Sequence, residues 1–367
     1  MKSKLGKITG ATLAALLIIL MAANLITPLV KPVFATPIND VSNGLGAFTG
    51  PRNGYNADDN VKASLDQLQA GMWAYANRSV EGLSMKRMFW YVDANVTASG
   101  SGRTPDTAFL TIQEAITASS NSTDDWIFVF DYSGGGATIT INKAFIHLIG
   151  NANKCMPYPR IMPATAVAGI TITDAGDRVE IAHLVIGGGD QTVPAITFSG
   201  AAGSYGVWIH DNVIGRDAAA PANDGILVPG GTAAPYLVVE NNIFHGSAGA
   251  GIDQSGIQIA GNATRGAILN NFFSDLGSGT HPAIYLSGGV TQVRIEGNRI
   301  AADDDGTAGW GITLGASCTD CWVNLNYGGS ATADGDAEMY DDLDAGDSED
   351  NNWGINYTGD LAGLPDD

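Results

Sequence analysis

The chain has 367 residues and a formal net charge of −20, because 38 aspartates and glutamates outnumber 18 lysines and arginines. This charge excludes nucleic acid as a partner, since binding to phosphates needs clustered cations. The 48 glycines are typical of an all-β domain with many tight turns, and the length suits one elongated domain. The acidity leaves Ca²⁺ open as a cofactor, because that ion binds several carboxylate oxygens.

Residues 1–35 have the features of an export signal. Three lysines precede an uncharged run over residues 8–30, and small residues at the cleavage positions end at Ala35. We prefer cleavage after Ala35, but the run is long enough to span a bilayer, so an uncleaved membrane anchor is the alternative. Both outcomes predict a protein that is secreted or displayed at the cell surface. Residues 36–57 are rich in Gly, Pro and Asn and predict a linker.

Residues 58–80 predict an amphipathic helix. Its apolar residues recur at alternating steps of four and three, as the a and d positions of a coiled coil do: Val61, Leu65, Leu68, Met72 and Tyr75. Two heptads are too few to hold strands together alone. The helix is therefore either a seam between chains, for which a homotrimer is the expected assembly, or a helix that lies on the domain.

Residues 90–118 predict a cap for the domain that follows. A Y-V-D strand and a Gly/Ser loop precede a short helix, T-I-Q-E-A-I, that Thr107 or Thr111 can cap. An exposed terminal coil would offer unpaired strand edges, so a cap is physically required. Residues 126–130, 139–141 and 145–149 then read as the strands of the first coils, with a proline-rich loop after them.

One short pattern returns between residues 169 and 327. Two apolar residues flank a variable one and recur at steps of 26, 30, 31, 27 and 28 residues: Ile170/Ile172, Ile196/Phe198, Ile226/Val228, Ile257/Ile259, Ile284/Leu286 and Ile312/Leu314. A second strand in later copies ends in an asparagine: Asn212, Asn242, Asn271, Asn298 and Asn326. The period of two indicates strands with one face inward, which excludes helical repeats and predicts a solenoid.

Stacked coils would place equivalent asparagines roughly 4.8 Å apart, so that their amides can form a ladder. Asparagine also tolerates the left-handed backbone of a tight corner. The residues resemble the right-handed parallel β-helix, or pectin-lyase-like, superfamily, whose repeat reads roughly G-I-x-I, a turn, V-x-I-x-x-N-x-I. The resemblance implies an all-β, right-handed, single-stranded parallel β-helix over residues 88–327 with an N-terminal capping helix. It does not identify a function, since this fold hosts lyases, hydrolases, tailspikes and adhesins.

Residues 328–367 predict an acidic C-terminal tail, of which Trp353, Ile355 and Tyr357 fold back onto the last coil. The segment beginning at Asp334 is not an EF-hand, because Met339 replaces the glycine and Ala345 replaces the final glutamate of that loop. Cys318 and Cys321 form either a small disulfide or two buried thiols. Zinc is excluded at this pair, since a tetrahedral site needs further ligands.

The residues between the I-x-I pairs face outward in one column: Thr171, Thr197, Leu227, Gln258, Tyr285 and Thr313. The enzymes that the chain resembles usually carry catalytic carboxylates or a basic residue on this face, and this column has none. The N-T-D, D-D, G-H-G and R-I-K signatures of polygalacturonases are also missing. No catalytic set is therefore carried over to this chain.

The turns before the I-x-I strands hold the first candidate site. Asp224, Asp253 and His281 are candidate catalytic residues, expected at matching positions one coil apart, and the two aspartates are also candidate metal ligands for Ca²⁺. Tyr285, Trp310 and Gln258 are candidate carbohydrate-binding residues, because aromatic faces stack on sugar rings. The alternative is that these polar residues only populate turns.

The second strand offers another candidate face, with two outward columns: Glu180, Trp208, Val238, Ala267, Arg294 and Trp322, then Ala182, His210, Glu240, Leu269, Glu296 and Asn324. Glu240 and Glu296 are expected two coils, or roughly 9.6 Å, apart, at the upper end of the separation used by inverting glycosidases. Trp208 is a candidate for carbohydrate binding. The sequence therefore predicts binding or processing of a polysaccharide or cell-surface glycan along the solenoid, with a non-enzymatic spike or adhesin as the alternative.

Overall fold

The structure is a computed structural model that describes residues 87–121, 123–134, 138–151, 158–163, 166–188, 193–215, 223–246, 252, 254–274, 281–301, 311–329, 340–342 and 351–358. These residues belong to one compact unit, Lys86–Asp367. The interpretations of residues 1–35, 36–57 and 58–80 lie outside the described residues. Within the described ranges, no helix has the length and apolar composition that crossing a membrane requires.

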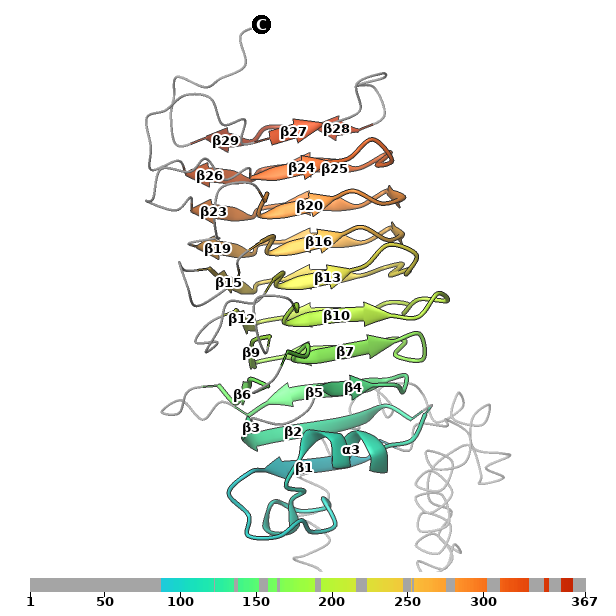
Figure 1. The fold of residues 1–367 in the computed structure, drawn as a ribbon, viewed down its shortest axis with the longest axis vertical. Coiled ribbons are helices and arrows are strands. Elements are labelled where there is room, and N and C mark those ends of the chain that lie inside the picture. Colours follow the sequence, from blue (N-terminus) through green and yellow to red (C-terminus); the bar gives the residue numbers. More distant parts are fainter. Residues whose placement is uncertain are drawn as a thin grey trace, which may run out of the picture. The chain divides into compact units, whose positions relative to one another are not determined.

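Three sheets of parallel strands form the domain, and each regular coil adds one strand to each sheet (Figure 1). We number the sheets in the order in which a coil visits them. The first sheet contains β4 (Ile139–Ile141), β7 (Ile170–Thr173), β10 (Ile196–Ser199), β13 (Ile226–Val228), β16 (Ile257–Ile259), β20 (Ile284–Leu286), β24 (Ile312–Leu314) and β27 (Tyr340–Asp342).

The second sheet contains β1 (Phe89–Asp93), β2 (Asp125–Asp131), β5 (Ile146–Gly150), β8 (Glu180–Ala182), β11 (Trp208–His210), β14 (Val238–Glu240), β18 (Ala267–Leu269), β22 (Arg294–Glu296), β25 (Trp322–Asn324) and β28 (Asn352–Trp353). The third contains β3 (Ser133–Gly134), β6 (Arg160–Ile161), β9 (Val185–Ile186), β12 (Val213–Ile214), β15 (Ile243–His245), β19 (Phe272–Ser274), β23 (Arg299–Ala301), β26 (Tyr327–Gly329) and β29 (Tyr357–Thr358). A short pair, β17 (Ala263–Thr264) and β21 (Val290–Thr291), links two turns. This arrangement confirms the predicted right-handed, single-stranded parallel β-helix.

The I-x-I residues form the core register that the repeat predicts. Ile257 pairs with Ile226 on one side and with Ile284 on the other, and all three side chains are fully buried. Large aromatic residues fill the space behind the third sheet, where Phe244 and Phe273 stack with ring centroids 4.7 Å apart. Burial of these side chains on every coil is the main stabilising contribution to a solenoid.

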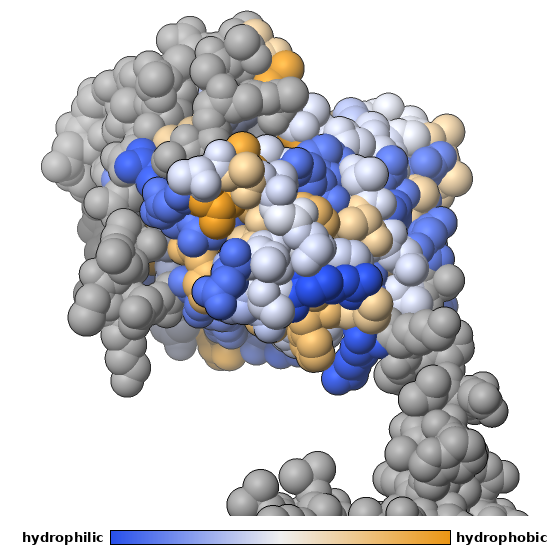
Figure 2. All heavy atoms as spheres, turned by 90° about the horizontal axis from the view of Figure 1, so that it is seen from below, coloured by the Kyte–Doolittle hydropathy of each residue, from blue (hydrophilic) through white to orange (hydrophobic). Residues whose placement is uncertain are grey.

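The predicted capping helix is α3 (Ile112–Ala118), which follows the short helix η2 (Pro105–Thr107). Thr111, one of the two predicted caps, forms a capping box with Glu114. Ile112 and Ile116 are fully buried, and α3 packs against β1, β2 and β4. Figure 2 views the molecule from this end. In the coloured part, hydrophilic and hydrophobic residues are mixed, so the hydrophobic core is not exposed on that surface.

From the coil of β11 to that of β25, each corner between the second and third sheets carries a left-handed residue followed by an asparagine, whereas in the coil before them the left-handed His183 is followed by Leu184. Asp211 has a φ of 53° and precedes Asn212, and Asn270, also at 53°, precedes Asn271. The left-handed conformation therefore falls on the residue before the repeated asparagine, whereas the sequence suggested the asparagine itself. The repeated asparagines use their side chains for hydrogen bonds, since Asn212 Nδ2 donates to Asn242 Oδ1 at 3.1 Å and Asn242 Nδ2 to Asn271 Oδ1 at 3.1 Å.

The structure departs from the predicted boundaries in two places. Strand β6 lies within the proline-rich segment that was predicted as a loop. Beyond residue 327, strands β27, β28 and β29 add one more member to each sheet, so the β-helix extends into the predicted tail. The sequence hides this coil because its first strand reads Tyr-Asp-Asp in place of an apolar pair. Cys318 and Cys321 are buried thiols, with Cys318 Sγ lying 3.1 Å from Leu286 O.

Candidate functional site

The outward columns of the second sheet follow the predicted register. His147, Glu180 and Trp208 occupy one column on β5, β8 and β11, and the neighbouring column places His210 beside Glu240. Neighbouring strands lie about 4.8 Å apart, so side chains in one column are within contact distance. This spacing brings residues that are some 30 positions apart in the chain into one polar cluster.

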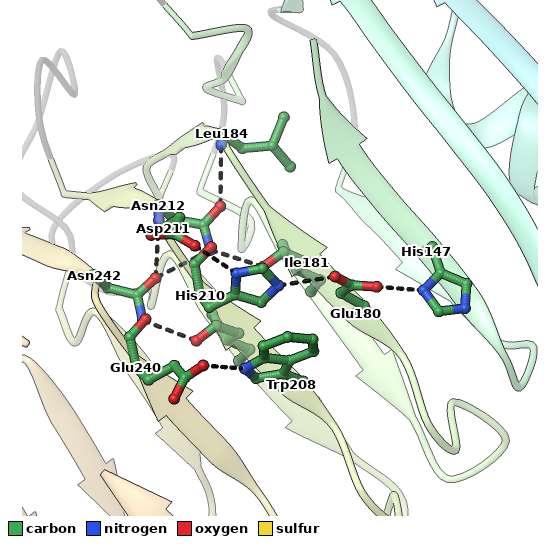
Figure 3. Close-up of polar contacts among 11 residues, drawn as sticks. His147, Glu180, Ile181, Leu184, Trp208, His210, Asp211, Asn212, Glu240 and Asn242 are labelled. Atoms are coloured by element: carbon green, nitrogen blue, oxygen red, sulfur yellow. Dashed lines mark hydrogen bonds and ion pairs between the residues drawn. The ribbon is translucent and has the colours of Figure 1, made fainter. Parts of the chain in front are cut away.

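A continuous row of acids and imidazoles crosses the second sheet (Figure 3). Glu180 contacts His147 Nδ1 through Oε2 and His210 Nε2 through Oε1, the latter at 2.9 Å. The other nitrogen of His147 lies 2.5 Å from Asp124 Oδ1, and the other nitrogen of His210 lies 2.7 Å from Asp211 Oδ2. Each imidazole therefore lies between two carboxylates.

This arrangement determines the charge of both imidazoles. A neutral imidazole has one N–H donor and one acceptor nitrogen, so it can donate to only one of two flanking carboxylates. Burial opposes the charged form, but hydrogen bonds and charge from Glu180 and Asp124 raise the pKa of His147, and those from Glu180 and Asp211 raise that of His210. Burial also opposes ionisation of Glu180, yet the two histidines lower its pKa to about 2. The contacts within the row thus favour the charged forms of both histidines and of Glu180.

An exposed indole lies against this row. The ring of Trp208 stacks on His210 with centroids 3.8 Å apart, and its Nε1 donates to Glu240 Oε1 at 3.1 Å. The Trp208 residue is 38% exposed, so its contacts hold the ring in place without covering it. A second indole, Trp126, stacks on His147 at 4.5 Å. The cluster therefore offers a positioned aromatic surface beside carboxylates.

The predicted carboxylate pair of the second sheet lies further along it. Glu240 and Glu296 both pair with Leu269, which places them two strands apart, as expected. Each already has a partner, because Glu240 accepts from Trp208 and Glu296 forms an ion pair with Arg294. The separation matches the prediction, but the paired carboxylates are held by neighbouring side chains.

The first sheet also has the predicted outward column, with Gln258 paired to Tyr285 on the next strand. Asp224, in the turn before β13, is 2% exposed. The backbone N–H of Ser255 donates to its Oδ1 at 3.2 Å, and the amide of Gln258, in the orientation that satisfies both side chains, donates to its two oxygens at 3.2 and 3.1 Å. The buried Asp224 and the partly buried Gln258 therefore form a polar pair next to Tyr285 in the register.

Burial raises the pKa of Asp224 to about 7, against a smaller lowering by the Ser255 hydrogen bond. A carboxyl group with a pKa near neutrality can both donate and accept a proton, which general acid–base catalysis requires. Among the predicted catalytic residues that the structure describes, Asp224 is thus the one whose surroundings favour such chemistry. His281 lies at the start of the same face and is exposed.

The strand register changes the expected stripe of Asp224, Asp253 and His281. Asp224 stands two residues before Ile226, and the equivalent positions before Ile257 and Ile284 hold Ser255 and Pro282. The sequence positions were not equivalent because the turns before these strands differ in length. Asp253 and Trp310 lie outside the described residues, and the described residues contain no group of three or more His, Cys, Asp or Glu arranged to hold a metal.

Sequence reasoning missed His147, Asp124 and the role of Asp211. The signal for His147 was present, because it alternates with the buried residues Ile146 and Leu148 and stands one coil before Glu180. Asp124 comes from the turn before β2, whose geometry no repeat predicts. The structure therefore assembles the cluster from two neighbouring columns and two turns.

In comparisons with known proteins, the chain is similar to solved structures in its fold. No protein-family model and no curated protein matches the sequence. An alginate lyase from Paenibacillus sp. str. FPU-7 aligns at 12% identity over 74% of this chain and 98% of its own, with a TM-score of 0.40. A pectin methylesterase from Erwinia chrysanthemi aligns at 13% identity over 72% and 92%, with a TM-score of 0.38. A rhamnogalacturonan lyase aligns at 13% identity over 76% of this chain and 64% of its own, with a TM-score of 0.27.

The coil itself determines the structural class. Three parallel sheets, a buried asparagine at the corner between the second and third of them, and a helix at the N-terminal end are all present in this one chain. In its architecture, the chain is a parallel β-helix, the fold that the sequence pattern predicts.

Proposed function

We propose that this chain is an exported, surface-associated protein that binds polysaccharide across the outward face of its second sheet. The observation that carries the proposal is the position of Trp208, which is exposed yet held by His210 and Glu240. An aromatic ring stacks on the apolar face of a sugar, and a ring that is already positioned loses little conformational freedom on binding.

The same sheet offers further contacts for an extended ligand. Trp322 is 47% exposed and lies in the same column as Trp208, four strands further along. The two indoles are therefore separated by roughly 19 Å along the solenoid. Glu240 lies on β14, between the strands of the two indoles, and Asp211 directly follows β11. Both carboxylates can accept hydrogen bonds from hydroxyl groups. A polymer that runs along the solenoid would reach both rings, whereas a monosaccharide would not.

The test is affinity electrophoresis in gels that contain dextran, gellan or polygalacturonate. Trp208→Ala is expected to weaken retardation by the bound polymer at least fivefold. Tyr327→Ala, which removes a ring that is 45% exposed on the third sheet, serves as the matched control and is expected to bind as the parent does. Equal retardation of the parent and Trp208→Ala in every gel would reject the proposal.

A second candidate function is processing of the bound polysaccharide at the first sheet. The observation in its favour is Asp224, a buried carboxyl with a pKa raised by burial to about 7, next to Gln258. Reducing-sugar and ultraviolet assays for unsaturated products test it, and Asp224→Asn is expected to abolish any activity. The non-enzymatic spike or adhesin is favoured instead by the outward column from Thr171 to Thr313, which carries no carboxylate. A parent protein that binds polymer without releasing products supports that alternative.

A further inference from the structure

The corner between the first and second sheets carries a row of residues with a left-handed backbone. In seven successive coils, a residue one or two positions before the second-sheet strand has a positive φ: Phe145, Arg178, Gly206, Tyr236, Arg265, Gln292 and Asp320. Glycine or asparagine occupies this conformation with least strain. Tyr236 and Arg265 nevertheless hold it, with φ values of 58° and 56°. Backbone strain kept at bulky residues is a reason to ask what their side chains do.

Three of these residues, Arg178, Tyr236 and Arg265, together with Tyr205, which directly precedes Gly206, form what we call the Arg–Tyr corner. The rings of Tyr205 and Tyr236 lie 4.7 Å apart. Arg265 donates from Nη1 to the Tyr236 hydroxyl at 2.9 Å and from Nε to Gln292 Oε1 at 3.1 Å. The guanidinium of Arg178 lies 5.2 Å from the centre of the Phe145 ring. Neutral groups therefore hold both guanidiniums in place.

The charge of this corner contrasts with that of the whole chain, which has a net charge of −20. In the described part of the chain, Arg87 and Arg294 form ion pairs with carboxylates, whereas Arg178 and Arg265 form none. Both Arg178 and Arg265 are exposed, and Tyr205 is 43% exposed. Two guanidiniums without acidic partners on one exposed corner remain available to an outside anion.

The order of the side chains restricts the ligand further. Arg178 and Arg265 precede β8 and β18, which are three strands apart, so their backbones are separated by roughly 14 Å. The two tyrosine rings lie between them. A guanidinium binds a carboxylate with two parallel hydrogen bonds, and a phenol ring stacks on the face of a sugar. The corner thus presents cationic sites at its ends and aromatic surface in its middle.

We propose that the Arg–Tyr corner binds a polysaccharide in which acidic sugars are separated by neutral ones, with Arg178 and Arg265 each binding a carboxylate and the tyrosines stacking on the sugars between. This inference rests on the proposed function and specifies the chemistry of the polymer. The Arg–Tyr corner would thus be a second row of polysaccharide contacts, next to the sheet that carries Trp208. Both rows run along the solenoid, because both follow the stacking of the coils.

The test compares the parent with the double variant Arg178→Gln/Arg265→Gln by calorimetry. The probes are gellan, in which glucuronate recurs among neutral sugars, polygalacturonate, in which every sugar is acidic, and neutral dextran. We expect the double variant to lose at least tenfold in affinity for gellan and to lose the salt dependence of that binding. Arg299→Gln, which removes an exposed arginine on the third sheet that lies over the rings of Phe272 and Tyr327, is the matched control and is expected to bind gellan normally.

Several outcomes would overturn the inference. These are equal gellan binding by the parent and the double variant, an equal loss in Arg299→Gln, or tighter binding of polygalacturonate than of gellan by the parent. Comparable binding of a DNA duplex would show a general cationic surface and also reject it. If Trp208→Ala weakens binding and the double variant does not, the proposed function stands and this inference fails. If the parent binds none of the three polymers, both fail.

Discussion

Glu180 and His210 come from neighbouring coils, and Glu180 Oε1 lies 2.9 Å from His210 Nε2. The other oxygen of Glu180 contacts His147, so one carboxylate joins three consecutive strands of the second sheet. Removing this shared partner leaves each imidazole with one carboxylate, that of Asp124 for His147 and that of Asp211 for His210.

Glu180→Gln is expected to lower the free energy of unfolding by about 1–3 kcal/mol, because it removes the charge from two hydrogen bonds. It should also bring the pKa values of His147 and His210 back toward 6.5, since Glu180 raises both. Chemical denaturation and NMR titration of the imidazoles measure the two effects. Glu296→Gln, which changes a carboxylate paired with Arg294 on β22, is the control, and unchanged imidazole titration in Glu180→Gln would contradict the assigned network.

The free energy of unfolding is expected to be highest over a middle range of pH and to fall at both lower and higher pH. The pKa values of His147 and His210 are raised in the folded state, so their contribution is complete below about 6.5 and is lost as pH rises through the raised values. The pKa of Glu180 is lowered to about 2, so its contribution is present above its ordinary value and is lost as pH falls toward 2. Asp124, Asp211 and Arg87 also face this row. Melting temperatures across pH should decline less steeply on the alkaline side in His147→Gln than in the parent.

Asp224→Asn is expected to stabilise the protein increasingly as pH rises from about 4 to about 7. Burial raises the pKa of Asp224 to about 7 in the folded state. The parent is therefore most stable when the carboxyl is neutral, at a pH below its unfolded pKa. It loses this stability as the pH rises to the folded pKa. The difference should grow on the order of 1.4 kcal/mol per pH unit and then remain constant. A melting difference that does not depend on pH would show that the Asp224 carboxyl is ionised throughout.

Ile257→Asp is expected to cost about 3–5 kcal/mol or more, because it buries a charge without a partner. Ile257 is fully buried between Ile226 and Ile284. Thr197→Asp, on the outward side of the same sheet, is the control and should change stability by about 0.5 kcal/mol or less. A soluble Ile257→Asp variant that melts with the parent would reject the register.

Asn271→Ala is expected to cost about 1–3 kcal/mol through unsatisfied buried groups. Its Oδ1 accepts from Asn242, and its Nδ2 donates to Asn298 Oδ1 at 3.0 Å and to Val239 O at 2.9 Å. The comparison is Ser274→Ala, in the same coil on the third sheet, measured by urea denaturation. Equal losses in the two variants would mean that the amide contacts contribute no more than a surface hydroxyl.

Two parts of the candidate site show which contacts the sequence could predict and which it could not. It placed Trp208 and Glu240 in neighbouring outward columns, because a strand alternates its side chains and a parallel register repeats them. It did not place Asp224 against Gln258, since that contact depends on how the turn before β13 enters the strand. It also overlooked β27, because its acidic residues hide the pattern.

The sequence alone determined the class of fold, the inward residues and the identity of the outward columns. These follow from a period of two within each strand and from a nearly constant repeat length, both of which are local properties of the chain. Tertiary structure alone decided which columns became a cluster. His147, Glu180 and His210 meet because coils stack about 4.8 Å apart, and their pKa shifts arise from burial and from partners that are distant in the chain. The stacking of the coils also brings Arg178 and Arg265 to the same corner. No residue next to either of them in the sequence predicts that position.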